Sequence, residues 1–213
     1  MNRNRRTLSI ALGIAALGAP FSGLAQQMRP GVDFLVLKPE LPVDSPGKIE
    51  VLEFFWYGCP HCYGLEPLIE TWLQKLPADV QFKRIPAVFN DRWAKDAAIF
   101  YALEATGNLE RLHRPLFDAI HRDSLKTDNG QALGQWLTKN GVDTKKFDEV
   151  GRSFSVQSKV RRAAQLSAAY KIEGTPAMAV QGRYTINTER GHPAMLATVD
   201  YLVEQVRRNA PPK

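Results

Sequence analysis

Apolar residues in this chain follow the period of a strand in some segments and the period of a helix in others. The longest strand-like run, IEVLEFFWY at residues 49–57, is apolar on both faces and rich in β-branched and aromatic side chains. Such a run is typical of a central strand that is buried on both sides. Four shorter runs also have strand character: 33–39, 80–89, 175–180 and 183–186. Gln181-Gly182 predicts a turn between the last two.

Helical spacing begins directly after the run at 49–57. Pro60 fits the first position of a helix, where the backbone N–H is unpaired in any case, and apolar residues continue at helical spacing to Pro77. From Asp91 to about Gln165 the period is helical, and turn-like sites divide it into several helices. These sites are Gly107, Asn129-Gly130 and Asn140-Gly141. A last helix is predicted from Pro193 to Arg208.

The predicted order of elements is two strands, a helix, a strand, a block of helices, two strands and a helix. This order predicts an α/β fold in which an all-helical domain, residues 91–165, is inserted into a small α/β domain made of residues 26–90 and 166–213. The apolar and aromatic stripes of the helical block should form the core of the inserted domain. Phe147, Val150 and Phe154 are among these expected anchors.

Residues 1–25 have the features of an export signal. Three arginines and no acid precede an apolar stretch from Leu8 to Leu17, which is shorter than the roughly 20 residues needed to span a bilayer. Small residues at Gly23 and Ala25 predict cleavage after Ala25. Ordinary secretion is preferred, and the Arg5-Arg6 pair leaves twin-arginine export open. We expect the mature chain in an exported, oxidising compartment.

Composition and charge exclude several classes of protein. Apolar residues make up 44% of the 213 residues and charged residues 23%, which is close to the globular average and argues against disorder. The full chain carries a formal charge of +6, but three of its 28 basic residues lie in the export signal. The others are scattered among acids, so we expect no nucleic-acid partner.

Two cysteines, Cys59 and Cys62, stand at C-x-x-C spacing where the buried strand meets the following helix. Haem attachment would need a histidine at the position of Tyr63, and zinc would need more ligands than two thiolates. Unpaired N–H groups and the dipole at a helix N-terminus stabilise a thiolate, so the pKa of Cys59 should be lowered. The pattern predicts a redox pair: Cys59 is the exposed reactive sulfur, and the more buried Cys62 resolves the mixed disulfide.

The residues between the cysteines are Pro60 and His61. His61 can donate a hydrogen bond or a positive charge to the Cys59 thiolate, which would make the disulfide more oxidising. The alternative is that His61 is an ordinary solvent-facing histidine at a helix start. The remaining histidines show no ligand pattern and are expected at the surface: His113, His121 and His192.

Glu53 interrupts the apolar run at 49–57, and a buried carboxylate is costly unless it is paired or protonated. Arg84 is the expected partner because it alternates with Phe82 and so shares the inward face of its strand. Lys83 is the competing choice. Alternatively, Glu53 reaches water at the end of its strand.

The segments FFWYGCPHCYGLEP and EGTPAMAVQGRY, on either side of a helical block, resemble the DsbA family of periplasmic thiol:disulfide oxidoreductases. The resemblance extends over residues 30–208 and implies a thioredoxin-like fold with an inserted helical domain. It further implies that Thr175-Pro176 forms a cis-proline loop, which packs against the cysteines and pairs with an extended substrate. It also implies that Glu53 is a buried acid that exchanges a proton with Cys62.

The resemblance implies a protein dithiol oxidase, with Cys59, Cys62, His61, Pro60 and Glu53 as catalytic residues. Its Cys59–Cys62 disulfide would pass to unfolded, newly exported proteins, with no cofactor other than that disulfide. A DsbB-type membrane quinone reductase would reoxidise it, and we expect a monomer. Two alternatives stay open: a disulfide isomerase or reductase, and a non-catalytic peptide-binding module whose disulfide is only structural.

Overall fold

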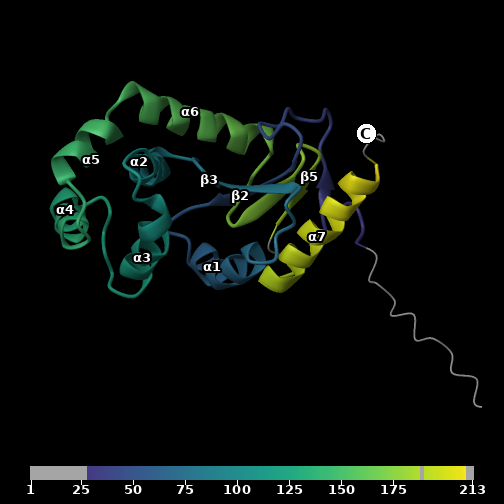
Figure 1. Ribbon diagram of the computed structural model, residues 1–213, viewed down its shortest axis with the longest axis horizontal. Coiled ribbons are helices and arrows are strands. Elements are labelled where there is room, and N and C mark those ends of the chain that lie inside the picture. Colours follow the sequence, from purple (N-terminus) through teal and green to yellow (C-terminus); the bar gives the residue numbers. More distant parts are fainter. Residues whose placement is uncertain (1–27, 188–189, 210–213) are drawn as a thin grey trace, which may run out of the picture.

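The computed structural model describes residues 28–187 and 190–209 (Figure 1). The predicted export signal and its cleavage site lie outside the described residues. The elements are β1 (Leu35–Val36), β2 (Ile49–Phe55), α1 (Pro60–Leu73), β3 (Val80–Pro86), α2 (Asp91–Ala105), α3 (Leu109–His121), α4 (Gly130–Lys139), α5 (Thr144–Gly151), α6 (Phe154–Ala169), β4 (Ala177–Val180), β5 (Tyr184–Ile186) and α7 (His192–Arg208). This is the predicted order of strands and helices.

The five strands form one mixed sheet in the order β1-β5-β4-β2-β3. β2 is parallel to β3 and antiparallel to β4, and all seven of its residues are buried, which confirms the prediction of a central strand. Alternate residues of β2 serve the two faces of the sheet. Val51 packs with α1 and α7 on one face, whereas Leu52 and Phe54 pack with Tyr170 at the end of α6 on the other. The two layers are visible in Figure 1.

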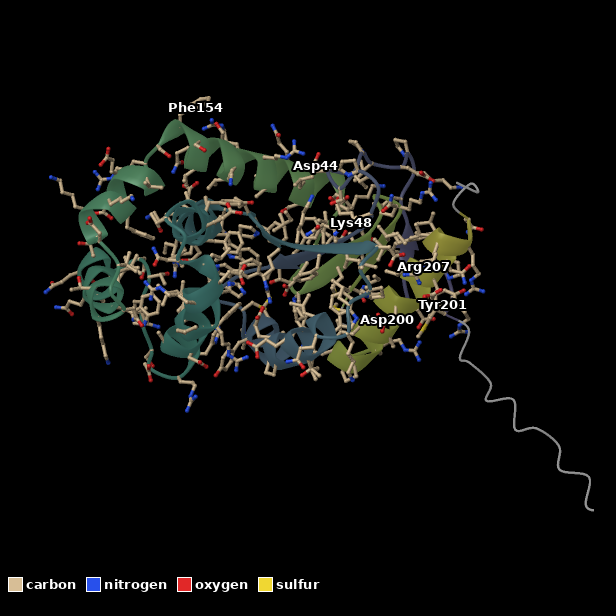
Figure 2. All side chains as sticks on the ribbon, in the orientation of Figure 1. Asp44, Lys48, Phe154, Asp200, Tyr201 and Arg207 are labelled. Carbon is tan, nitrogen blue, oxygen red and sulfur yellow. The ribbon has the colours of Figure 1, made fainter. Side chains whose placement is uncertain are left out.

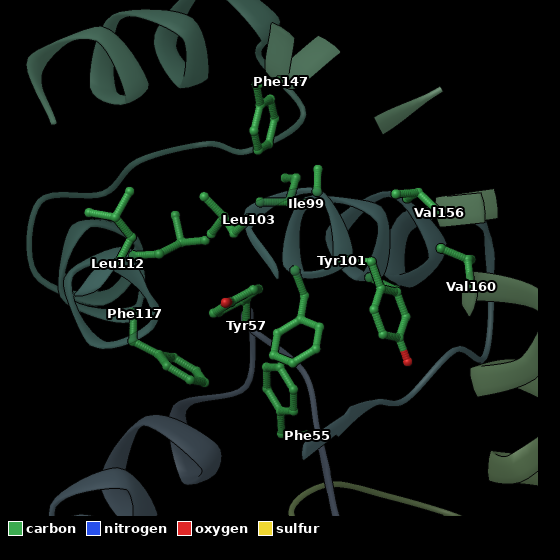
Figure 3. Packing of buried hydrophobic residues seen from close by; sticks show 14 of the residues in the cluster. Phe55, Tyr57, Ile99, Tyr101, Leu103, Leu112, Phe117, Phe147, Val156 and Val160 are labelled. Carbon is green, nitrogen blue, oxygen red and sulfur yellow. The ribbon is translucent and has the colours of Figure 1, made fainter. Parts of the chain in front are cut away.

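In the helical block α2–α6, helices α2–α5 lie beyond the carboxyl end of β2, and α6 runs back from them over one face of the sheet (Figure 1). Figure 3 shows how the core of the block continues into the sheet domain: Phe55 and Tyr57 reach Ile99 and Phe117 from the block. β2 itself ends at Phe55, two residues before the predicted end, because a turn follows. A Cβ at Gly58 would lie 2.3 Å from the Trp56 ring, so only glycine fits beneath this indole.

Other details also differ from the sequence-based expectations. The break between α5 and α6 was not predicted; Ser153 makes it by accepting a hydrogen bond from the N–H of Val156. Phe154 is consequently 82% exposed rather than a core anchor, and Figure 2 shows it pointing outward. α6 also continues four residues past Gln165. β1 is only two residues long, because Leu35 and Val36 alone pair with β5.

Gln181 and Gly182 turn the chain between β4 and β5, as predicted, and both have positive φ angles of 54° and 63°. Such a turn suits the right-handed twist of the two strands that it joins. Within the described residues, no helix combines the length and the apolar character needed to cross a bilayer.

Candidate active site

The turn at the end of β2 places both cysteines at the start of α1. Cys59 is the N-cap residue, and its sulfur accepts a hydrogen bond from the N–H of Cys62 at 3.4 Å. Both cysteines are free thiols. Cys62 is fully buried and Cys59 is 6% exposed, so the prediction of an exposed Cys59 holds only in the relative sense. Packing of the 175–176 loop against Cys59 explains the difference: the sulfur lies 3.2 Å from the backbone oxygen of Thr175.

The two thiols differ in acidity, as predicted. A hydrogen bond from the Cys62 thiol is the largest cause that lowers the pKa of Cys59, and it acts against burial. The Thr175 side chain and the backbone N–H groups of Cys62 and His61 add to it, and the pKa falls to about 5. By standard hydrogen-bond geometry, the buried Thr175 hydroxyl has no partner among the described residues. Burial and the hydrogen bond to Cys59 raise the pKa of Cys62 well above its ordinary value.

The side chain of His61 is exposed at the first turn of α1. Among the leading causes of the lowered pKa of Cys59, it is the backbone N–H of His61 that takes part. The His61 ring lies 6.4 Å from the ring of His192, measured between centroids. His192 is half-buried rather than at the open surface, because Gly64 leaves room for it; a Cβ at Gly64 would lie 3.3 Å from its Cε1. Burial, then His61, lowers the pKa of His192, and Cys59 opposes them.

Thr175-Pro176 is a cis peptide bond, as expected from the resemblance. Pro176 is buried and Thr175 is half-buried directly before β4. The loop meets the first turn of α1 at Cys59. It therefore covers one side of the reactive sulfur.

Glu53 is 0% exposed, so the alternative that it reaches water is wrong. The parallel register sets Glu53 opposite Arg84, and Arg84 Nε lies 3.2 Å from Glu53 Oε2, which confirms the expected partner. Lys83 instead pairs with Glu50 at 2.8 Å. Neither oxygen of Glu53 has a hydrogen-bond partner of standard geometry among the described residues. Burial, then the charge of Glu66, raises the pKa of Glu53 to about 8 against the pull of Arg84.

Two residues of this buried cluster were missed by the sequence analysis, Glu66 and His113. Glu66 Oε2 accepts a hydrogen bond from Arg84 Nη2 at 3.0 Å, and its Oε1 lies 3.2 Å from His113 Nε2. His113 Nδ1 lies 2.9 Å from Tyr57 Oη. The surface assignment of His113 is wrong, since the residue is 6% exposed. The available signal was its spacing of four residues from Phe117, which puts both on one face of α3.

His121, also expected at the surface, is half-buried and contacts the backbone of Tyr57, whose side chain contacts His113. Its Nε2 lies 2.8 Å from the backbone oxygen of Tyr57, and its ring stacks on Tyr63 with centroids 4.9 Å apart. The cluster borders a cavity of about 900 Å³ between β3 and the helical block, whose lining includes Glu66, Arg84 and His113. Within residues 28–187 and 190–209, no group of three or more potential ligand side chains is arranged to hold a metal ion.

Comparison with known proteins shows to which family the chain belongs. A family model described as DSBA-like thioredoxin domain matches residues 80–198. The thiol:disulfide interchange protein DsbA of Burkholderia cepacia is 41% identical over 214 residues, covering 97% of this chain and 98% of the relative. The chain belongs to the DsbA family. Another member, DsbA of Azotobacter vinelandii, is 40% identical over 195 residues, covering 90% of this chain and 91% of its own.

Solved structures of the DsbA family agree with the fold. The crystal structure of Pseudomonas aeruginosa DsbA gives a TM-score of 0.78 at 39% identity, covering 83% of this chain and 93% of that one. Oxidoreductase DsbA from Xylella fastidiosa gives 0.80 at 29% identity, covering 85% and 98%. The chain therefore has the thioredoxin-like α/β fold of DsbA and is a thiol:disulfide oxidoreductase. The family model begins at residue 80 and so does not include Cys59 and Cys62.

Proposed function

We propose that this DsbA-family protein is a dithiol oxidase that donates its Cys59–Cys62 disulfide to unfolded, newly exported proteins. The observation that carries the proposal is the asymmetry of the pair: the pKa of Cys59 is lowered to about 5, while that of Cys62 is raised. Stabilising the thiolate stabilises the reduced form of the protein. A disulfide whose reduced form is stabilised is a strong oxidant.

The exchange proceeds in two displacements. A substrate thiolate attacks the Cys59 sulfur, the Cys59–Cys62 bond breaks, and Cys62 leaves as a thiolate that takes a proton from Glu53. A second substrate thiolate then attacks the substrate sulfur of the mixed disulfide, and Cys59 leaves as a stable thiolate. Two substrate thiols lose two electrons and form a disulfide, and the protein is left in the dithiol form.

The loop at Thr175-Pro176 is the proposed substrate-binding element. It lies against Cys59, and the backbone of Thr175 is placed to pair with an extended segment of an unfolded protein. Such pairing needs no particular side chain in the substrate. His61 is exposed in the first turn of α1, two residues after Cys59. We infer that its side chain adds a donor or a positive charge for the thiolate.

The compartment and the partner belong to the same proposal. The signal-like pattern of residues 1–25 supports export to the periplasm and cleavage after Ala25. Each cycle leaves the protein reduced, so an oxidant must restore the disulfide. We infer a membrane quinone reductase of the DsbB type for this step, and a monomeric protein. No bound cofactor other than the disulfide is needed, because exchange itself carries the electrons.

The test is the oxidation of a reduced, unfolded protein that contains two cysteines, under conditions where oxygen is excluded. The oxidised chain should form one substrate disulfide per molecule. Offered a substrate that already contains a disulfide, Cys62→Ser should trap a mixed disulfide, because the Cys59 thiolate attacks that bond and one substrate thiol leaves. Cys59→Ser should trap none, because Cys62 is buried. Failure of the wild-type chain to oxidise the substrate would contradict the proposal. If the dithiol form then rearranges the disulfides of a scrambled protein, the chain is an isomerase or reductase. If neither redox form exchanges disulfides, it is a binding module.

A further inference from the structure

The two carboxylates of the buried cluster near Cys62, Glu53 and Glu66, have different hydrogen-bond partners. Both oxygens of Glu66 have partners, Arg84 Nη2 at 3.0 Å and His113 Nε2 at 3.2 Å. Neither oxygen of Glu53 has a hydrogen bond of standard geometry, and its ion-pair contact is Arg84 Nε at 3.2 Å. The Arg84 guanidinium thus lies between two buried carboxyl groups. Of these, only Glu66 has a hydrogen-bond donor for each of its oxygens.

The hydrogen bonds fix the tautomer of His113. Burial, then the charge of Glu66, raises the pKa of Tyr57 well above its usual value, so its phenol keeps the proton and donates to His113 Nδ1. The proton of the neutral ring is then on Nε2, which donates to Glu66 Oε1. Burial works to raise the pKa of Glu66, but His113 and then Arg84 outweigh it and lower the pKa.

Two carboxylates that share one cation in a buried site retain one proton between them. We propose that His113 is a positioning residue that decides where this proton lies: by donating to Glu66 it keeps Glu66 ionised and leaves the proton on Glu53. This inference rests on the proposed proton transfer between Glu53 and Cys62. Cys62 is near enough for the charge of Glu53 to raise its pKa, after the larger effects of burial and Cys59.

The consequence for exchange follows from the position of the proton. With Glu66 ionised, Glu53 is protonated at the moment when Cys62 leaves as a thiolate. Glu53 then gives its proton to Cys62 and becomes a carboxylate, which Arg84 stabilises. Without His113, Glu66 keeps the proton and Glu53 stays ionised on Arg84, with nothing to give. Other charged groups around the cluster act from further away and do not distinguish the two acids by contact: Asp96 of α2 and Glu110 of α3.

The test is a pH titration of the glutamate side-chain carboxyls by 13C NMR in the intact reduced chain. Glu53→Gln and Glu66→Gln assign the two signals. In His113→Leu the midpoint of Glu66 should rise by about one pH unit or more, the size expected for losing a hydrogen bond to a charged acceptor, and that of Glu53 should fall. His113→Gln, which keeps an N–H donor, should restore the wild-type order.

Two matched controls separate this role from packing. His121→Gln alters a histidine on the same helix, whose hydrogen bond goes to the backbone oxygen of Tyr57 and not to Glu66. Tyr57→Phe removes the donor to His113 Nδ1 while leaving Nε2 in place. Both should leave Glu66 ionised. Unchanged midpoints in a folded His113→Leu chain, or an equal change in His121→Gln, would overturn the inference.

A kinetic measurement keeps this inference distinct from the function on which it rests. Release of Cys62 from the disulfide by a small thiol should slow several-fold in Glu53→Gln and in His113→Leu at pH 7, but not in His113→Gln. An unchanged rate in Glu53→Gln would refute the proton transfer of the proposed function. A slowed rate in Glu53→Gln with an unchanged rate in His113→Leu would refute the role of His113 alone.

Discussion

The stability of the reduced protein should rise relative to that of the oxidised protein between pH 5 and pH 8. The Cys59 thiolate exists only in the reduced form, and its stabilising contacts exist only in the folded chain. Its folded pKa is depressed, so the extra stability is complete above the pKa of the unfolded thiol and is lost as pH falls through the folded value. That folded pKa is about 5.

The magnitude follows from the two pKa values. A free cysteine has a pKa of about 8.5, and each pH unit between the two values is worth about 1.4 kcal/mol. Between pH 5 and pH 7 the free energy of unfolding of the reduced form therefore rises by about 2 kcal/mol. Screening by solvent at one side of the sulfur lowers this gain to about 1 kcal/mol. A four-residue disulfide loop stabilises the oxidised form by about 2 kcal/mol at any pH. The thiolate and the disulfide contribute similar free energies at neutral pH. The test is therefore how the difference in stability between the reduced and oxidised forms changes with pH, not its value at a single pH.

Urea unfolding of both redox forms at several pH values between 5 and 8 measures this change. Other titrating groups contribute nearly equally to the two forms, so the difference between them isolates the cysteine pair. The reduced Cys59→Ser variant is the control, and its stability should lack the gain between pH 5 and pH 8. If the reduced and oxidised curves stay parallel over this range, the folded structure does not stabilise a Cys59 thiolate.

Three further outcomes are expected. His61→Ala should leave the fold intact and move the potential of the cysteine pair in the reducing direction by about 30 mV, the equivalent of one pH unit of thiolate stabilisation; no shift in a glutathione buffer would leave the backbone and Cys62 as the stabilising groups. Phe117→Ala should lower the free energy of unfolding by about 3–5 kcal/mol and Phe154→Ala by less than about 0.5 kcal/mol in denaturant titrations, and similar losses would contradict the placement of the two rings. Intact-mass analysis of the exported protein should show Gln26 as its first residue, whereas retention of residues 1–25 would contradict the predicted cleavage.

Local patterns were enough to predict the sheet and the cysteine pair. The double burial of β2 follows from a run that is apolar on both faces, and the pairing of Glu53 with Arg84 follows from alternation along a strand. The helix start at Pro60 follows from backbone chemistry alone. Each of these features is decided within a few residues, or by the period of a single element.

Contacts between distant parts of the chain were not predictable in this way. His113 meets Glu66 across 47 residues of sequence, and the sheet domain and the helical block must both form before that contact exists. His192 reaches the first turn of α1 only because Gly64 leaves space there. Phe154 belonged to a plausible helical stripe, but a cap at Ser153 started a new helix and turned the ring outward.

The equilibrium of the Cys59–Cys62 pair with glutathione at pH 7 tests the dithiol oxidase proposal most directly. Trapping the thiols by alkylation and weighing the intact protein gives the fraction reduced at each ratio of glutathione to its disulfide. A dithiol oxidase with a Cys59 thiolate requires a potential more oxidising than about −200 mV, so that the disulfide gives up its bond in an oxidising compartment. A potential below about −270 mV, in the range of reductases and structural disulfides, would contradict it.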